Sequence, residues 1–160
     1  GRRGPGGGPV TGRRVGAAVA AVVVLACGGE RGDSSGRARP NVEHVTIQVA
    51  AGRPAYAAGE PMPLTIAVRN PTTAAITLRF ATSQRYDFVI ESAGGAAVWR
   101  WSAGRSFVPR RGGQTVPPGW ELNYSETFGG RLAPGRYRVR ALVTAVDDAL
   151  EAVTEVTVRP

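Results

Sequence analysis

Residues 85–102 read RYDFVIESAGGAAVWRWS, in which two stretches of alternating apolar and polar residues flank a pair of glycines. Glycine adopts positive φ angles readily, and two adjacent glycines can form a two-residue hairpin turn. Alternation with a period of two is typical of a strand that has one buried face. The sequence therefore predicts a β-hairpin with its turn at Gly94 and Gly95.

This turn sets the register of the hairpin and divides its side chains between two faces. Ile90 is expected opposite Trp99, and Phe88 opposite Trp101. The apolar face carries Tyr86, Phe88, Ile90, Trp99 and Trp101. The polar face carries Asp87, Glu91, Arg100 and Ser102.

Burial explains the two tryptophans without a ligand. One buried tryptophan removes about 150–250 Å² from water, an upper limit of about 4–6 kcal/mol of stabilisation. The polar face is expected to form a small surface network, in which Arg100 lies diagonal to Asp87 and Glu91. Each such pair contributes at most about 1 kcal/mol. We therefore expect this hairpin to be structural.

Similar short stretches recur along the rest of residues 42–160, separated by turn residues. Strands are expected at 45–49, 64–70, 75–80, 86–91, 97–102, 122–128, 136–141 and 153–158. Gly- and Pro-rich loops are expected at 52–63 and 103–119, and a turn or a single helical turn at 147–152. The pattern predicts an all-β fold, an immunoglobulin-like antiparallel β-sandwich of about seven to nine strands.

The net charge of +8 lies mostly outside this predicted domain. The first 40 residues hold seven arginines against Glu30 and Asp33, and every basic residue of the chain is arginine. We ascribe the arginine bias to a GC-rich genome, so nucleic acid is not an expected partner.

Other residue counts exclude several kinds of chemistry. The chain has one cysteine, Cys27, and one histidine, His44, which leaves no internal disulfide and no multi-histidine metal site. The acidic residues form no paired arrangement along the predicted strands. We expect neither catalytic residues, nor a metal, nor a cofactor, and so no enzyme.

The N-terminal residues are typical of an export signal. Arg13 and Arg14 precede the apolar run 15–26, which is too short to span a bilayer of about 30 Å. The sequence VLAC at 24–27 resembles the lipobox of bacterial lipoproteins, in which the cysteine is lipidated. We expect a lipoprotein signal peptide at 1–26 and a lipid anchor on Cys27.

The Gly-, Ser- and charge-rich residues 27–41 are then expected to be a flexible tether that precedes the domain at 42–160. The protein is accordingly expected to be exported and lipid-anchored to the bacterial cell envelope, where it binds the membrane through that anchor.

Several separated motifs of the domain occur together in one order. They are YAAGEP at 56–61, Asn70, LRFATSQRYDF at 78–88, VWRWS at 98–102 with Phe107, and LAPGRYRV at 132–139. Together they resemble the BsuPI-type intracellular proteinase inhibitor domain. The resemblance implies a β-sandwich whose namesake inhibits a bacterial serine protease.

This chain departs from the family pattern in two ways. It looks exported whereas the namesake is intracellular, which leaves the target protease open. Phe128 stands where the family pattern has tryptophan, and we expect a substitution within the core.

Three functions remain open at this point. The first is a non-catalytic, monomeric protein-interaction module at the cell envelope. The second is a serine protease inhibitor that acts through the loop 103–119, whose candidate residues are Arg105, Phe107, Arg110 and Arg111. The third is a ligand-binding sandwich in which Trp120 stacks on a ligand, unless Trp120 covers the end of the sandwich. Arg136, Arg138 and Arg140 are expected to line the wet face of a strand, or else to bind an acidic partner.

Overall fold

The computed structural model describes residues 45–147 and 150–160. The described residues form ten strands and no helix, so the predicted all-β class is confirmed. The expected signal peptide at 1–26, the lipidation site Cys27, the tether at 27–41 and His44 lie outside the described residues. The boundaries proposed for those segments therefore stay predictions.

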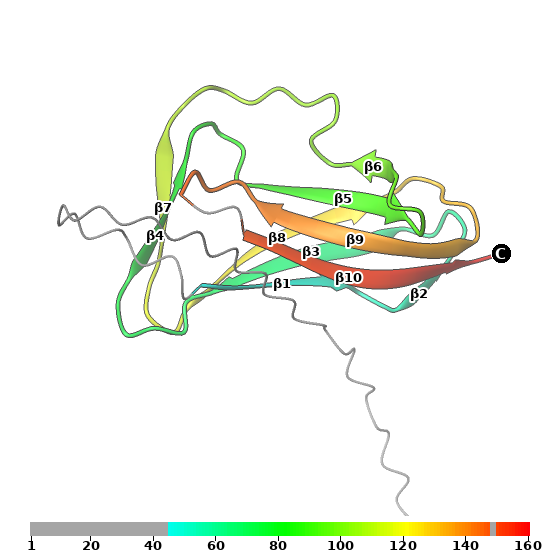
Figure 1. The fold of residues 1–160 in the computed structure, drawn as a ribbon, viewed down its shortest axis with the longest axis horizontal. Coiled ribbons are helices and arrows are strands. Elements are labelled where there is room, and N and C mark those ends of the chain that lie inside the picture. Colours follow the sequence, from blue (N-terminus) through cyan, green and yellow to red (C-terminus); the bar gives the residue numbers. More distant parts are fainter. Residues whose placement is uncertain (1–44, 148–149) are drawn as a thin grey trace, which may run out of the picture.

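Two sheets pack as a sandwich around a shared core (Figure 1). The first has the order β1-β3-β8 and comprises Thr46–Ala51, Met62–Arg69 and Glu121–Phe128. The second has the order β2-β10-β9-β5-β6 and comprises Ala55–Ala57, Leu150–Arg159, Gly135–Val143, Tyr86–Ser92 and Ala97–Arg100. A separate pair, β4 (Ile76–Phe80) and β7 (Gly112–Val116), stands at one end of the molecule (Figure 1). The immunoglobulin-like character of the sandwich stays a prediction.

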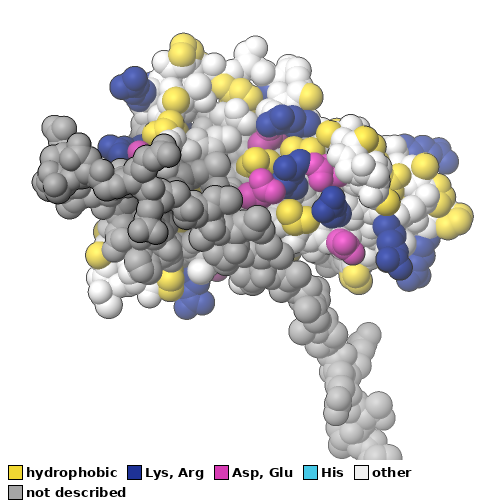
Figure 2. Space-filling view, viewed as in Figure 1, with side chains coloured by type: hydrophobic (Ala, Val, Ile, Leu, Met, Phe, Trp, Pro, Cys, Tyr) yellow, Lys and Arg dark blue, Asp and Glu magenta, His cyan; other side chains and the backbone are white. Residues whose placement is uncertain are grey.

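Alternation along the strands builds the core, as the sequence predicts. In β3 the buried residues are Met62, Leu64, Ile66 and Val68, and in β9 they are Tyr137, Val139, Ala141 and Val143. The alternate positions of β9 carry arginines on the opposite face. Arg136 and Arg138 are exposed, while Arg140 is half-buried and pairs with Glu91 and Glu151. The arginine stripe is thus the solvent-facing side of β9, and Figure 2 shows basic and acidic side chains next to one another on this side of the molecule.

Two strands occur inside segments that the sequence predicts as loops, which raises the number above the expected seven to nine. β2 lies within 52–63, and β7 lies within 103–119. β2 also runs parallel to β10, whereas all other strand pairs are antiparallel. The prediction of a turn over 147–152 is wrong at its end, because β10 begins at Leu150.

The β5–β6 hairpin does not use the predicted two-residue turn. The Ser92 carbonyl accepts from the Gly95 N–H at 2.9 Å, and the Ser92 N–H donates to the Ala96 carbonyl at 2.8 Å. Gly95 has a φ of 83°, and Gly94 has no positive φ. The turn is therefore a three-residue loop whose last residue is left-handed.

The longer turn shifts the strand pairing by one residue, and a β-bulge then shifts it back. Glu91 pairs with Ala97 rather than with Val98. The bulge accommodates Val98, so that Ile90 pairs with Trp99 in the predicted register. The hairpin therefore keeps its predicted apolar face although its turn differs.

The apolar face packs as expected. Phe88 and Ile90 are fully buried, and Trp99 and Trp101 are half-buried against the core. The ring of Trp99 meets Phe128 edge-on at a centroid distance of 5.1 Å. Phe128 is thus a core residue, as the sequence predicts.

The polar face contains the predicted Arg100–Asp87 pair, but it is not a surface network. Asp87 is fully buried, because the chain beyond β6 turns back over this face and brings Ser102 onto the carboxylate. The carboxylate accepts from Arg100 Nε at 2.6 Å, from the Ser102 hydroxyl at 2.7 Å and from the Ser102 N–H at 3.1 Å. Glu91 is also buried, and it pairs with Arg140 instead of Arg100.

Candidate functional site

The candidate site centres on residues 103–111, which connect β6 to β7 and are called here the 103–111 segment. In Figure 1 this connection runs along the outside of the molecule, away from both sheets. It is the part of the predicted loop 103–119 that precedes β7. Contacts at several points hold it in place.

The first half of the segment is anchored on Trp101. Gly104 has a φ of 73° and allows a turn in which the Arg105 N–H donates to the Ser102 carbonyl at 3.1 Å. Arg105 Nε then donates to the Trp101 carbonyl at 2.9 Å, and its guanidinium lies 4.3 Å from the centroid of the Trp101 ring. Phe107 packs on the same ring at 5.8 Å. Arg105 and Phe107 thus anchor the segment to the domain.

Tyrosines fix the ring of Trp101 in turn. Tyr86 lies between Trp101 and Tyr124, with centroid distances of 4.6 and 4.7 Å. The Tyr86 hydroxyl donates to Glu126 at 2.5 Å, and the Tyr124 hydroxyl donates to Gln114 at 2.8 Å. Burial, followed by the Glu126 contact, raises the pKa of Tyr86, and burial raises the pKa of Tyr124 to about 12. Both tyrosines stay neutral at ordinary pH and form a fixed aromatic base for the segment.

The middle of the segment is fixed through its backbone. The Val108 N–H donates to Ser83 Oγ at 2.9 Å, and the Val108 carbonyl accepts from the Ser83 N–H at 2.9 Å. The Arg110 N–H donates to the same Val108 carbonyl at 2.7 Å. The side chains of Val108 and Arg110 nevertheless point away from the core, since Val108 is 63% exposed and Arg110 is exposed. The segment therefore exposes these two side chains to solvent, while its backbone groups are already hydrogen-bonded within the domain.

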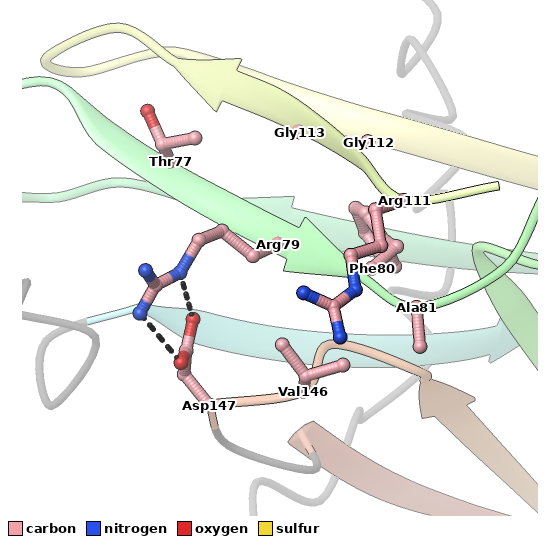
Figure 3. Close-up of a pocket in the computed structure, with 9 residues that line it drawn as sticks. All are labelled: Thr77, Arg79, Phe80, Ala81, Arg111, Gly112, Gly113, Val146 and Asp147. Atoms are coloured by element: carbon pink, nitrogen blue, oxygen red, sulfur yellow. Dashed lines mark hydrogen bonds and ion pairs between the residues drawn. The ribbon is translucent and has the colours of Figure 1, made fainter.

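A hollow of about 730 Å³ lies beside the end of the segment, on the outer face of β4 and β7 (Figure 3). Its lining consists of Thr77, Arg79, Phe80, Ala81, Arg111, Gly112, Gly113, Val146 and Asp147. Gly113 pairs with Arg79 across the two strands, and its missing side chain leaves the floor open. The hollow exists because a glycine stands where the neighbouring positions of this face carry side chains.

Two arginines border the hollow in different ways. Arg79 forms a two-point ion pair with Asp147, through Nε and Nη2 at 2.7 Å each. This pair raises the pKa of Arg79 and lowers the pKa of Asp147. Arg111, the residue before β7, reaches into the hollow on the side of Val146 (Figure 3), and it forms no ion pair with the described residues. The sequence predicts the same role for Arg110 and Arg111, and the structure places them in different surroundings.

Trp120 lies outside this site. It is 65% exposed, so its ring does not seal the end of the sandwich. Its carbonyl accepts from the N–H of Asn70 at 3.0 Å, which fixes its backbone beside the start of β8.

A family model described as BsuPI, intracellular proteinase inhibitor, matches residues 49–147. The chain belongs to the BsuPI family. The match runs from β1 to Asp147, so this BsuPI domain includes both the 103–111 segment and the hollow. Cys27 lies outside the match.

Solved structures add only distant likenesses to this BsuPI chain. The sporulation control protein Spo0M of Bacillus subtilis has a TM-score of 0.48 at 14% identity, over 73% of this chain and 50% of its own. The Pseudomonas fluorescens alkylpurine DNA glycosylase AlkC has a TM-score of 0.46 at 17% identity, over 73% of this chain and 31% of its own. The C-terminal domain of wzt has a TM-score of 0.46 at 11% identity, over 73% of this chain and 74% of its own. The BsuPI chain thus spans half of Spo0M and less than a third of AlkC, and no curated protein matches its sequence.

The described part of the BsuPI chain, 45–147 and 150–160, contains no group of three or more His, Cys, Asp or Glu residues arranged to hold a metal ion. Within the same residues, no helix has the length and the apolar character needed to cross a membrane.

Proposed function

We propose that the protein is a non-catalytic protein-interaction module that binds its partner through the 103–111 segment. The observation that carries this proposal is the way the segment is held. Arg105 and Phe107 fix its first half on Trp101, while Val108 and Arg110 remain exposed. A surface that is already ordered loses little conformational entropy when a partner binds.

Serine protease inhibition is the second candidate, and the family description supports a protease as partner. Arg110 is exposed and suits a trypsin-like pocket, whereas Arg105 lies over Trp101 and Arg111 lines the hollow. An inhibitor that enters a protease cleft as an added strand needs free backbone groups near that side chain. Here Ser83 occupies both backbone groups of Val108, proline at 109 has no N–H, and the Arg110 N–H is already bonded. The geometry therefore favours binding through side chains over substrate-like insertion.

The proposed location is the cell envelope, with the domain held there by a lipid on Cys27. The apolar run 15–26 and the VLAC sequence that ends in this cysteine support it. At about 0.8 kcal/mol for each buried methylene, two or more acyl chains hold a protein stably on a membrane. The test is the Cys27→Ala variant of the full chain. We expect it to move to the soluble fraction, and membrane retention of the variant would contradict the lipid anchor.

Binding through the segment is tested by affinity capture from envelope extracts with the full chain. A Val108→Ser, Arg110→Gln double variant should lose the captured protein, whereas Arg138→Gln on the distant wet face of β9 should keep it. Equal capture by the unchanged full chain, the double variant and the Arg138→Gln variant would contradict the proposal.

The unchanged chain and the two variants are also assayed against trypsin-like and subtilisin-like proteases. Inhibition that depends on Arg110 would establish the second candidate, and full protease activity would remove it.

A further inference from the structure

We propose that the hollow above Gly113 is a carboxylate-binding site, which takes an acidic side chain from an extended segment of the protein partner. This inference deepens the proposed function and rests on it. It specifies which side chain the partner must carry where it contacts the surface beside the 103–111 segment.

The charges around the hollow favour a monoanion. Among the described residues that line the hollow, Arg79 and Asp147 neutralise each other through their two-point ion pair, so Arg111 supplies the net charge of +1. A guanidinium binds a carboxylate through two parallel N–H donors. A phosphate dianion would bring a second negative charge close to Asp147, which costs electrostatic energy. A carboxylate therefore fits this set of charges better than a phosphate does.

The two arginines offer donors at the same opening. Asp147 uses Nε and Nη2 of Arg79, and Arg79 Nη1 makes no hydrogen bond with the described residues. The ion pair also holds the Arg79 side chain beside the hollow, so that it need not be ordered when a ligand arrives. In Figure 3 the guanidinium groups of Arg79 and Arg111 lie on the same side of the sheet, over the segment that carries Val146.

The free edge of β7 explains why the occupant is an extended segment. Within the described residues β7 pairs with β4 alone. Its sequence GGQTV contains neither a charge nor a proline, the residues that natural edge strands use to prevent pairing. A strand added along this edge would place the residue opposite Gly113 on the outer face, above the hollow. Most other edges differ, since β2 has three residues, β6 has four and contains a bulge, and β4 and β8 carry charged residues. The edge strand β1, TIQVAA, also lacks a charge and a proline, but none of its residues lines the hollow.

The experiment uses the full chain and a labelled peptide of alternating threonine and glutamate, with the matching threonine–glutamine peptide as control. Fluorescence anisotropy gives the dissociation constants, and NMR spectra of the arginine Nε–H groups locate the contact. We expect saturable binding of the glutamate peptide alone, with shifts at Arg79 and Arg111. Equal binding of the glutamine peptide would overturn the proposal.

Two variants test the site, one through its charge and the other through its space. Arg111→Gln removes the charge and should weaken binding about tenfold, the effect of losing about 1.4 kcal/mol. Gly113→Ala keeps both arginines but puts a methyl group on the floor, 3.1 Å from Thr77 Cγ2, and should weaken binding by a similar factor. Arg138→Gln removes the same charge from an exposed position on β9 and should change binding by less than about twofold. Equal losses in Arg111→Gln and Arg138→Gln would show general attraction and contradict the site.

A competition arm tests the ligand chemistry. Acetate should displace the glutamate peptide at a lower concentration than inorganic phosphate does, and the reverse order would overturn the carboxylate assignment. The peptide experiments do not use the natural partner. If the glutamate peptide fails to bind, the capture result for Val108 and Arg110 therefore still stands. A failed capture with retained peptide binding would instead contradict the proposed function.

Discussion

Asn70 shows at the scale of one residue how a buried amide joins parts of this fold. Its Nδ2 donates to the carbonyls of Ala74 and Val116 at 2.7 and 2.9 Å, and its Oδ1 accepts from Thr72. The side chain thereby connects the turn after β3 to the end of β7. The sequence singles out Asn70 through the family resemblance, and the structure supplies the physical reason.

We predict that Asn70→Ala lowers the free energy of unfolding by about 2 kcal/mol. The change leaves the buried carbonyl of Val116 without the Nδ2 donor, and such a group costs about 1–3 kcal/mol, whereas the Ala74 carbonyl keeps the Thr72 hydroxyl as a donor. Urea unfolding followed by tryptophan fluorescence measures the effect. Asn123→Ala is the matched control, because Asn123 is exposed and should change stability by less than about 0.5 kcal/mol. Equal losses in both variants would contradict this role of Asn70.

Tyr86 and Tyr124 predict a pH dependence in the alkaline range. Their pKa values are raised in the folded protein, so the fold retains protons that the unfolded chain releases from about pH 10 upward. The free energy of unfolding should therefore fall as the pH rises from about 10 to about 12. The Tyr86→Phe, Tyr124→Phe double variant should show a flatter profile over this range in urea titrations. An unchanged slope would show that these two hydroxyls do not cause the loss.

The fate of Asp87 shows what a strand pattern predicts at this scale and what it does not. The alternation placed Asp87 opposite the apolar face, and the structure confirms that side. Its burial depends on the path of the chain after Arg100, which folds Ser102 over the carboxylate. Alternation within one hairpin holds no information about a segment that covers it from outside.

At the scale of the element, the β5–β6 turn assigns different tasks to its two glycines. Gly95 carries the left-handed conformation, and Gly94 does not. We predict that Gly95→Ala lowers the free energy of unfolding by about 1 kcal/mol, because a Cβ atom is strained at positive φ. Gly94→Ala should be close to neutral, since its Cβ would meet only Ser92 Oγ at 3.9 Å. Thermal unfolding of both variants decides between this turn and the two-residue turn, which would strain both.

β7 is a strand that cannot be predicted from its own sequence. β3 and β9 bury alternate apolar residues and are readily predicted. GGQTV has no such alternation, and it becomes a strand because it pairs with β4, more than thirty residues earlier in the chain. The hollow of the candidate site depends on this pairing, so no sequence pattern indicates it beyond the two glycines themselves.

At the scale of the whole molecule, the sandwich depends on its last strand. β10 lies between β2 and β9 and buries Ala152, Val156 and Val158. We predict that deletion of residues 150–160 abolishes cooperative unfolding. Each buried valine contributes about 1.5–3 kcal/mol, and the total stability of a domain is about 5–15 kcal/mol. Circular dichroism during heating tests this, with deletion of Pro160 alone as the control, because Pro160 is exposed and outside β10. A sharp transition in the longer deletion would contradict the prediction.

The sequence predicts the sandwich correctly, but it does not predict how β2 joins it. The three residues of β2 are too few to show a pattern, and their parallel register is set by Thr157, Val158 and Arg159 at the other end of the domain. Long-range pairing of this kind depends on the completed fold. Strand patterns predict which residues face the core, and they leave the order of the sheets open.

The place of β10 also constrains how the chain is made. During synthesis β2 and β9 are both available before the strand that must lie between them has been translated. The five-stranded sheet therefore cannot close until residue 159 has left the ribosome, and non-local β-pairing forms slowly even then. The sandwich is therefore completed only after β10 has been translated.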